Sequence, residues 1–315
     1  MPIDEEEVDR LRLLHQIYLH LFNNELTTVP LSHPTKILDI GTGSGDWAME
    51  MGDSWPSAEI IGTDIAKIQP SAVPLNVFFE IDDAEEEGGW TWEENTFDLV
   101  HFRNMAGAFQ NWEHVYRETY THLKPGGWIE VLDFDDHEAF LNIYGTSSLL
   151  AGALGEIGEA ARKAGRPRGS GHLKTELLER IGFTDVHIED FQVPCGIWPE
   201  EREERNIGKL WLVALLNGLE GYLLRLMVEQ NGWGITKVRE VCESLQVEMR
   251  SMGMDRERAK GLEIHILVLV GRKPGGIDDD DDDDEDDDEE EEESADEELD
   301  AESIETATPT TRELD

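Results

Sequence analysis

Residues 37–47 read Ile-Leu-Asp-Ile-Gly-Thr-Gly-Ser-Gly-Asp-Trp, and this stretch decides the fold. An apolar run leads through Asp39, glycines stand at the alternate positions 41, 43 and 45, and a helix-compatible stretch follows. Glycine is needed where a backbone turns sharply or lies against a ligand with no Cβ in the way. A loop of this kind between a strand and a helix meets an adenosine-containing cofactor at the carboxyl edge of a parallel sheet.

The spacing of the glycines indicates which cofactor to expect. The dinucleotide fingerprint G-x-G-x-x-G would need a glycine at position 46, where this chain has Asp. The arrangement D-x-G-x-G-x-G instead resembles motif I of the class I S-adenosylmethionine (SAM) methyltransferases. The resemblance implies SAM as the cofactor. The residues of this loop expected at the cofactor are Asp39, Gly41, Thr42, Gly43, Ser44 and Gly45.

Polar residues follow the next three expected strands. Strand 59–64 ends at Asp64, nineteen residues after Gly45, close to the distance of about 20 residues at which an acid meets ribose hydroxyls. Strand 77–81 precedes a segment that, in the methyltransferase pattern, hydrogen-bonds the adenine amino group. A fourth strand spans 97–102. The additional cofactor-site residues expected here are Asp64, Ile65, Asp82, Asp83, Ala84, Arg103 and Asn104.

The order of the following elements predicts an α/β fold. A helix that places Trp112, Val115, Thr119 and Leu123 on one face should stop at residues 124–127, Lys-Pro-Gly-Gly. A fifth strand follows at 128–132. Strand, glycine loop, helix and then strands that end in acids together predict a Rossmann-like class I SAM methyltransferase fold, with helices on both faces of a mostly parallel sheet.

The carboxyl-terminal half should complete a seven-stranded sheet. Residues 174–181 read as a helix that stops at Gly182, followed by strands at 186–193 and 262–270. In class I methyltransferases the last two strands form an antiparallel hairpin with a short loop. Here a helical insertion, residues 197–261, precedes the last strand, with helices near 203–228 and 236–251. It is expected to be a substrate lid or a partner surface, or to pack simply as a core.

Beyond motif I, several segments are similar to the fungal LaeA-like methyltransferases, which regulate or tailor secondary metabolism. These segments are 37–47, 55–65, 68–70, 79–85, 90–92, 102–107, 123–127, 182–183, 194–199 and 271–274. The likeness spans roughly residues 5–274 and is dense through 36–134. It implies a SAM-dependent transferase. Some members of the family work as nuclear partners of velvet regulators, and others are thought to modify pathway metabolites.

An amino-terminal helix is expected from Glu5 to about Phe22, capped by Asp4, with an apolar stripe of Val8, Leu11, Tyr18 and Phe22. In the related methyltransferases such a helix folds over the cofactor, so residues 1–30 are expected to be a helical cap. The side chains of His15, Tyr18 and His20 either face the active site or serve packing and surface roles.

No catalytic residue can be assigned from the sequence. Residues 133–138 form a polar cluster after the fifth strand, where a carboxylate or imidazole could take a proton from the acceptor; the alternative is an ordinary loop rich in capping residues. His101 lies inside a strand and is expected to be buried with a backbone partner. Methyl transfer to a carboxylate or thiolate needs no base, so a missing dyad is compatible with activity.

The charge of the chain is strongly negative, −45 over 315 residues. Residues 278–315 hold 24 acidic residues and one Arg, so they carry −23 and the remaining 277 residues carry −22. This tail is expected to be disordered, either as a docking arm for basic partners or as a solubilising terminus. Direct nucleic-acid binding is not expected. The basic residues that cluster are Arg162, Lys163, Arg166 and Arg168, expected in a glycine-rich loop.

Other classes of site and location are disfavoured by composition. Cys195 and Cys242 make neither a disulfide framework nor a zinc site, and no metal is expected. The first residues are acidic, unlike a secretory signal. No stretch reaches the roughly 18 apolar residues of a membrane span, the longest run being 210–216. The expected location is the cytoplasm or nucleus.

Three functions remain open from the sequence. The first is methylation of a small-molecule metabolite by SAM. The second is a regulatory role in the nucleus through a protein partner of the velvet type, or on a protein substrate. The third is a SAM-fold protein that has lost binding, which Asp39, Gly41, Gly43, Gly45 and Asp64 all argue against.

Overall fold

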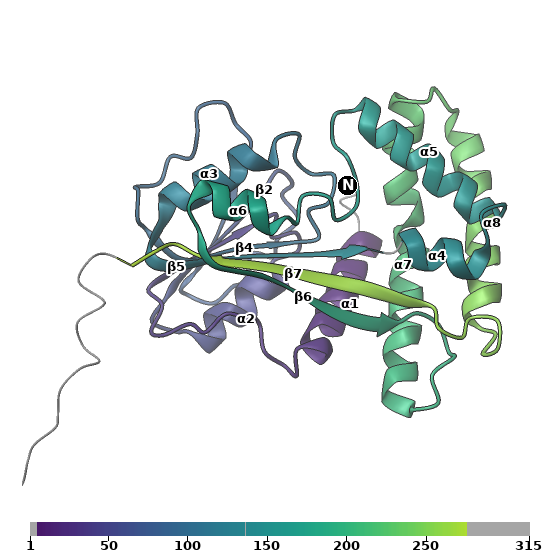
Figure 1. The fold of residues 1–315 in the computed structure, drawn as a ribbon, viewed down its shortest axis with the longest axis horizontal. Coiled ribbons are helices and arrows are strands. Elements are labelled where there is room, and N and C mark those ends of the chain that lie inside the picture. Colours follow the sequence, from purple (N-terminus) through teal and green to yellow (C-terminus); the bar gives the residue numbers. More distant parts are fainter. Residues whose placement is uncertain (1–4, 136, 276–315) are drawn as a thin grey trace, which may run out of the picture. The chain divides into compact units, whose positions relative to one another are not determined.

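Seven strands form one sheet in the order β3-β2-β1-β4-β5-β7-β6 (Figure 1). The structure is a computed structural model that describes residues 5–135 and 137–275. The strands are β1 Lys36–Ile40, β2 Glu59–Asp64, β3 Val77–Ile81, β4 Phe97–Arg103, β5 Leu123–Asp135, β6 Thr184–Pro194 and β7 Glu263–Arg272. β1 to β5 pair in parallel, and β7 runs antiparallel to both β5 and β6. The predicted fold class is confirmed.

The central strands are apolar because both of their faces are covered. Residues 37–40 of β1 and 99–102 of β4 are buried almost without interruption, as expected for parallel strands between two helix layers. On one face the core contains Ile37, Leu99 and Trp47. On the other it contains Leu38 and Val100. The strand order reverses between β1 and β4, so the carboxyl ends of these two strands flank the crevice where such sheets bind ligands.

Helices cover both faces of the sheet. α1 (Glu5–Leu21) and α2 (Asp46–Ser54) lie on one side, while α3 (Trp112–His122) and α6 (Thr175–Ile181) lie on the other (Figure 1). α3 begins after Asn111, whose side chain accepts a hydrogen bond from the His114 N–H and satisfies one free donor of the first turn. The segments that follow β1, β2 and β4 begin at the carboxyl ends of these strands. We call this edge of the sheet the ligand edge.

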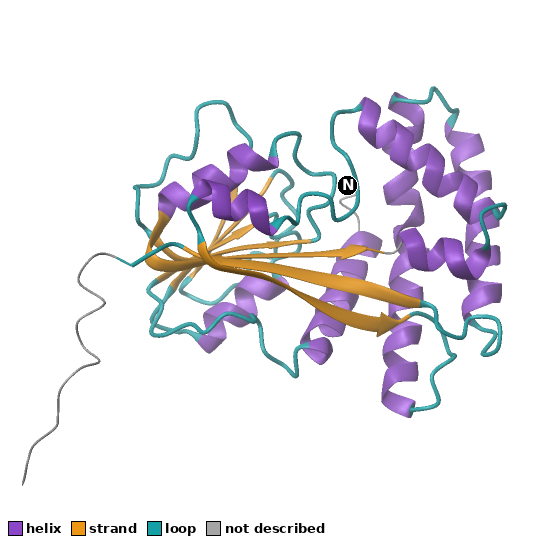
Figure 2. Cartoon of the chain, in the orientation of Figure 1, coloured by secondary structure: helices purple, strands orange, loops and turns teal. Residues whose placement is uncertain are grey.

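Four further helices pack together beyond the carboxyl edge of the central strands (Figures 1 and 2). α4 (His137–Tyr144) and α5 (Leu149–Lys163) connect β5 to the α6 segment, and no pattern in the sequence analysis had predicted them. α7 (Arg202–Glu229) and α8 (Ile235–Gly253) form the predicted helical insertion before β7. α1 packs against α7 through an edge-on contact of Tyr18 with Trp211, with ring centroids 6.5 Å apart.

Among the described helices, α7 alone is long and apolar enough to cross a membrane by length and composition, with an 18-residue mean hydropathy of 1.3. This differs from the expectation that no stretch reaches that length. Trp211, Leu219 and Met227 of this helix are buried within the protein. A helix packed in a protein core passes the same test, so the finding is weak evidence for a span.

Three local expectations were only partly right. Of the apolar stripe expected in the amino-terminal helix, Tyr18 and Phe22 are buried. α1 does not bury Val8 and Leu11, which are half-buried; its inner face includes Leu14, Ile17 and a buried ion pair of Arg10 with Glu7 at 2.7 Å. Because two charges can be buried when they pair, an apolar-stripe rule misses this face.

The Lys-Pro-Gly-Gly segment at 124–127 does not separate α3 from the fifth strand. α3 ends at His122 and β5 begins at Leu123, with a register shift opposite residues 97–99 of β4. Gly126 has φ +80°, a left-handed conformation that lets the irregularity lie inside the strand.

The basic cluster does not lie in one loop. Arg162 and Lys163 are the last residues of α5, and Arg166 and Arg168 are in the loop that follows. The predicted acidic tail, residues 278–315, lies outside the described residues. The helical cap at 1–30 and the lid at 197–261 stay predictions as functional units.

Candidate functional site

The loop after β1 is held by hydrogen bonds from its own backbone and side chains. Gly41 N and Thr42 N both donate to the carbonyl of Thr63 at the end of β2, at 2.8 and 2.9 Å. The Thr42 hydroxyl donates to Asp39 Oδ2 at 2.6 Å. The buried carboxylate of Asp39 therefore holds the loop from inside the sheet. Asp39 thus has a structural role in addition to its predicted position beside the cofactor.

Gly43 has a left-handed backbone conformation that disfavours a side chain, and it lies close to α1. Its φ is +58°, and a Cβ placed on it would lie 3.3 Å from Leu11 of α1. Its N–H donates to Asp64 Oδ2 at 2.9 Å, while its carbonyl accepts from Gln69 Nε2 at 2.7 Å. The backbone of residues 41–45 thus lies between α1 and the end of β2. We call this loop the cradle, because a ligand can approach its backbone at the glycines.

Ser44 and Gly45 complete the turn into α2. The Ser44 hydroxyl donates to Asp46 Oδ2 at 2.5 Å. Gly45 has φ +82° and lies against the ring of Phe79. These contacts place residues 41–45 at the amino end of α2, where backbone N–H groups favour a negatively charged ligand group.

Asp64 stands at the end of β2 beside this loop. Its Oδ2 accepts from Gly43 N, and its Oδ1 accepts from Ala66 N at 2.8 Å. Each carboxylate oxygen keeps a lone pair for a further donor, as two ribose hydroxyls require. Burial raises the pKa of Asp64, and these two N–H donors oppose the rise. The neighbouring Ile65 is exposed.

Residues 82–84 follow β3 and lie next to the end of β2. Asp82 N donates to the Asp64 carbonyl at 3.1 Å. Asp83 Oδ1 accepts from Glu85 N at 3.0 Å, which shapes the turn. Ala84 is buried, and its carbonyl accepts from the Trp90 indole at 3.0 Å. The structure therefore brings the acids after β2 and β3 to one edge, as the sequence predicted.

Arg103 and Asn104 end β4 and meet the amino-terminal helix. Arg103 Nη1 lies 3.2 Å from His15 Nδ1, and its guanidinium lies 5.0 Å from the Tyr18 ring centroid. Burial lowers the pKa of Arg103, against the attraction of Asp39. Asn104 has φ +59°, and its Oδ1 accepts from the Tyr18 hydroxyl at 2.5 Å.

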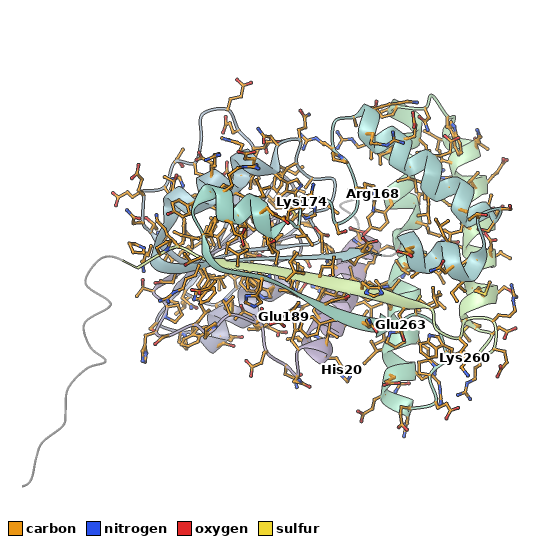
Figure 3. The ribbon with its side chains drawn as sticks, in the orientation of Figure 1. His20, Arg168, Lys174, Glu189, Lys260 and Glu263 are labelled. Atoms are coloured by element: carbon orange, nitrogen blue, oxygen red, sulfur yellow. The ribbon has the colours of Figure 1, made fainter. Side chains whose placement is uncertain are left out.

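The helix α1 thus contributes two of its three candidate side chains to the ligand edge. Burial, with the nearby positive charge of Arg103, lowers the pKa of His15 to about 3, so this imidazole is neutral near pH 7. Burial raises the pKa of Tyr18, which keeps the phenol protonated. His20 is exposed, near the end of α1 (Figure 3).

His101 is buried, but its partner differs from the expected backbone group. Its Nδ1 lies 2.7 Å from Asp39 Oδ1, and its Nε2 lies 3.9 Å from Glu130 Oε2. The ring stacks on Trp47 with centroids 3.8 Å apart. A hydrophobic-strand pattern predicts burial, but it does not predict a carboxylate from a neighbouring strand as the partner.

Glu130 was missed by the sequence analysis. Its carboxylate is fully buried and accepts from Thr28 N at 2.7 Å, Thr28 Oγ1 at 2.8 Å and Thr27 Oγ1 at 3.0 Å. It therefore ties the segment after α1 to the sheet. The available signal was an acid inside the strand at 128–132, because buried acids are rare unless they are paired.

The strand β5 extends to Asp135, so the first residues of the polar cluster at 133–138 lie inside the strand and not after it as expected; Asp133 is fully buried and Asp135 is half-buried. Asp133 Oδ2 accepts from Met105 N at 3.1 Å and lies 3.1 Å from His172 Nε2, without hydrogen-bond alignment to that nitrogen. His172 stacks on Trp112, with ring centroids 4.0 Å apart. Sequence analysis did not single out His172, since it comes from a loop distant along the chain.

The residues present fit a SAM-type cofactor. The Gly43 backbone has no Cβ between it and a ligand, and Asp64 has unused acceptor capacity for a diol. A separate cavity of about 10 Å³ lies under α1 among His15, Tyr18 and Arg103; it is the size of one water molecule. Within the described residues, no group of three or more His, Cys, Asp or Glu could hold a metal ion.

Comparisons with known proteins show the family to which the chain belongs. A family model described as a methyltransferase domain matches residues 12–188. Methyltransferase pytC of Aspergillus terreus is 33% identical over 282 residues, covering 87% of this chain and 82% of the relative. Secondary metabolism regulator LAE1 of Cochliobolus heterostrophus is 33% identical over 256 residues, covering 79% and 83%. Regulator laeA of Aspergillus fumigatus is 28% identical over 256 residues, covering 79% and 67%.

Solved structures are more distant. The cyclopropane synthase MmaA2 from Mycobacterium tuberculosis has a TM-score of 0.49 and 15% identity, covering 82% of this chain and 84% of the other. Phosphoethanolamine N-methyltransferase 2 of Haemonchus contortus, in complex with S-adenosyl-L-methionine, has a TM-score of 0.41 and 18% identity, covering 84% and 52%. The family match and the curated relatives together place the chain: it belongs to the SAM-dependent methyltransferases, among the relatives that include pytC and the LaeA-type regulators of secondary metabolism.

Proposed function

We propose that this methyltransferase transfers the methyl group of SAM to a small-molecule metabolite. The observation that carries the proposal is the closure of the ligand edge by α1. On one side Tyr18 donates to Asn104 at the end of β4, and on the other it packs against Trp211 of α7. An edge covered in this way suits an acceptor that is enclosed rather than a side chain presented by a large protein.

In methyl transfer the protein's main role is to align the acceptor with the methyl group and to exclude water. When bound, SAM supplies a methyl carbon, to which the acceptor's lone pair bonds while the carbon–sulfur bond breaks and its electron pair stays on sulfur. The cradle at Gly43 and the carboxylate of Asp64 hold the cofactor side. Neutral His15 and protonated Tyr18 add no charge of their own beside the reacting groups.

A second candidate function is regulatory. It is favoured by the relatives named as secondary metabolism regulators, LAE1 and laeA. In this case the chain would act in the nucleus through a protein partner of the velvet type, or would methylate a protein residue. The acidic carboxyl-terminal segment, with its 24 acids, would then serve as an arm for basic partners.

Calorimetric titration tests the cofactor half of the proposal first. SAM and S-adenosylhomocysteine should bind saturably, and NADH, the control, should not. The protein is then incubated with methyl-labelled SAM and either a small-molecule extract or a protein extract of the producing cells. Label in the small-molecule fraction supports the first function; label confined to protein, or none with cofactor bound, would favour the regulatory one.

Deletion of residues 278–315 separates the two functions in cells. Under the metabolite function, turnover and cellular phenotype should both survive the deletion, because the expected cofactor-binding residues lie within 39–104 and none of them is deleted. Loss of the phenotype with turnover intact would support a regulatory role that depends on the acidic segment. Localisation in the cytoplasm or nucleus is read from the same cells with a fluorescent fusion.

A further inference from the structure

Arg168 lies over the carboxyl edge of the central strands. It belongs to the loop between α5 and α6, and its Cγ would lie 3.2 Å from a Cβ placed on Gly107, in the loop after β4. Figure 3 shows Arg168 between the sheet and the helical group that contains α5 and α7. The side chain is half-buried. It is therefore placed where the acceptor of the methyl group would enter.

Among the described residues, the guanidinium of Arg168 has an aromatic neighbour and no hydrogen-bond acceptor. Its Cζ lies 4.5 Å from the ring centroid of Tyr222 on α7, a cation–π distance. Within residues 5–135 and 137–275, no hydrogen bond or ion pair to this guanidinium is formed. Its planar set of N–H donors is thus oriented by Tyr222 and left available for a ligand.

The neighbouring guanidinium groups differ in this respect. Arg10, on the α1 side of Tyr222, makes two hydrogen bonds to Glu7 at 2.8 and 2.7 Å. Arg166 lies 3.1 Å from Glu85 and donates to the Ala108 carbonyl. Each of these charges is satisfied within the protein, so they shape the edge, whereas Arg168 is free to bind an anion.

The charges around Arg168 limit what anion it can take. The nearby carboxylate of Asp133 is fully buried and contacts Met105 N and His172. It interacts with Arg168 only through the electric field of the guanidinium. Residues 1–277 carry a net charge of −22. One guanidinium in such an acidic body suits a singly charged carboxylate better than a phosphate dianion.

We propose that Arg168 and Tyr222 bind the carboxylate of an acidic metabolite, which is the methyl acceptor or carries the accepting group. The guanidinium holds both carboxylate oxygens, and the Tyr222 ring packs against the adjoining apolar part. This assignment rests on the proposed small-molecule function and names its substrate class. It also gives α7 a role in substrate selection.

The test uses pairs of carboxylic acids and their primary amides, such as benzoate with benzamide and cinnamate with cinnamamide. Binding to the full chain saturated with S-adenosylhomocysteine is measured by ligand-observed NMR. Acids should bind at least about tenfold more tightly than their amides, since a charge-assisted bidentate contact is worth one or more factors of ten. Arg168→Gln should abolish that difference and leave the amide affinity unchanged.

Matched variants separate this role from folding. Arg162→Gln removes an exposed arginine paired with Glu159 at the end of α5 and should bind the acids like the unchanged chain. Tyr222→Phe should retain acid binding and Tyr222→Ala should weaken it. Acids that bind no better than amides, fail to bind, or bind Arg168→Gln equally well would overturn the assignment. Failure of the proposed function itself would appear separately, as lost binding of S-adenosylhomocysteine in the unchanged chain.

Discussion

At the scale of single residues, Gly43 and Asp64 form the contact on which the cofactor edge depends. The Gly43 N–H donates to the Asp64 carboxylate across 21 residues of sequence, and the glycine has φ +58°. A left-handed backbone costs a β-branched residue on the order of 1–3 kcal/mol. The Cβ of a larger residue at position 43 would strain the backbone, and it would also lie close to Leu11.

Replacement Gly43→Val should therefore lower the affinity for S-adenosylhomocysteine by at least about a hundredfold, as the lost backbone approach and the strain act together. Calorimetric titration measures it. Gly88→Val is the control, because Gly88 is exposed and nothing lies within 4 Å of an added Cβ; it should bind normally. Undiminished affinity in Gly43→Val would disprove the motif assignment.

His15 should make stability depend on pH. Burial and Arg103 lower its pKa to about 3 from 6.5; Glu50 at 3.2 Å opposes this, but its side chain is 43% exposed and solvent screens it. The unfolded chain therefore binds a proton that the folded chain does not, so stability is complete above pH 6.5 and falls toward pH 3.

The contribution of His15 can be measured by difference. Chemical unfolding of His15→Gln between pH 7 and 5 should lose less stability than the unchanged chain, by up to about 1.4 kcal/mol per pH unit below 6.5. His20→Gln, on the exposed side of the same helix, should follow the unchanged chain. Parallel pH profiles for His15→Gln and the unchanged chain would show that folding does not lower the pKa of His15.

At the scale of elements, the position of α1 depends on one buried acid in β5. Glu130 accepts three hydrogen bonds from Thr27 and Thr28, just after α1, and lies near His101, which contacts Asp39. The connection runs from the segment after α1, through Glu130, His101 and Asp39 on three strands, to the loop after β1. Hydrogen bonds and one 3.9 Å charge contact, between His101 and Glu130, therefore link the cofactor cradle to the segment that follows α1.

Glu130→Ala should destabilise the fold by about 3 kcal/mol, because it leaves the half-buried donors of Thr27 and Thr28 without their acceptor. Backbone N–H exchange at Thr28 should quicken more than exchange in α6, on the opposite face. Glu159→Ala removes an exposed acid of α5 and should change stability by less than about 1 kcal/mol. A variant at Glu130 as stable as the control would mean that the hydrogen bonds from Thr27 and Thr28 do not stabilise the fold.

At the scale of the whole molecule, two separate apolar cores lie on opposite faces of the sheet. The ligand edge lies at the carboxyl ends of the strands between them. One core joins α1, α2 and the helical group, and includes Trp47 and Trp211; the other joins α3 and α6, and includes Trp112 and Leu178. A ligand bound at the edge contacts segments from both sides and should stabilise the chain as a unit.

S-adenosylhomocysteine at a concentration of 100 times its Kd should add about 2.7 kcal/mol of stability. For a domain of this size, the midpoint temperature of thermal unfolding should rise by several degrees, roughly 2–4 °C per kcal/mol of added stability. Gly43→Val should show no rise at the same concentration, and NADH none in either protein. A similar rise with NADH would mean that the stabilisation is not specific to the methyl-donor site.

What the sequence alone determined is local. The glycine and aspartate positions at 39–45, the acids after β2 and β3 and the apolar strands follow from spacings of a few residues, since turns, strand burial and helix periodicity are set over that range. The helices α4 and α5 were not predicted, although α5 buries Leu150, Ala153, Ile157 and Ala160 at helical spacing. The Lys-Pro-Gly-Gly stop was predicted from turn chemistry, but the structure absorbs it as an irregularity at the start of β5.

The tertiary structure decided which distant residues meet. Tyr18 and Asn104 are 86 residues apart and His101 and Asp39 are 62, and Arg168 meets Tyr222 only because the loop after α5 crosses the ligand edge. Such contacts depend on how the helices pack over the sheet, which no local spacing records. The cofactor class was therefore readable from the sequence, whereas the groups that face the acceptor emerged only from the packing.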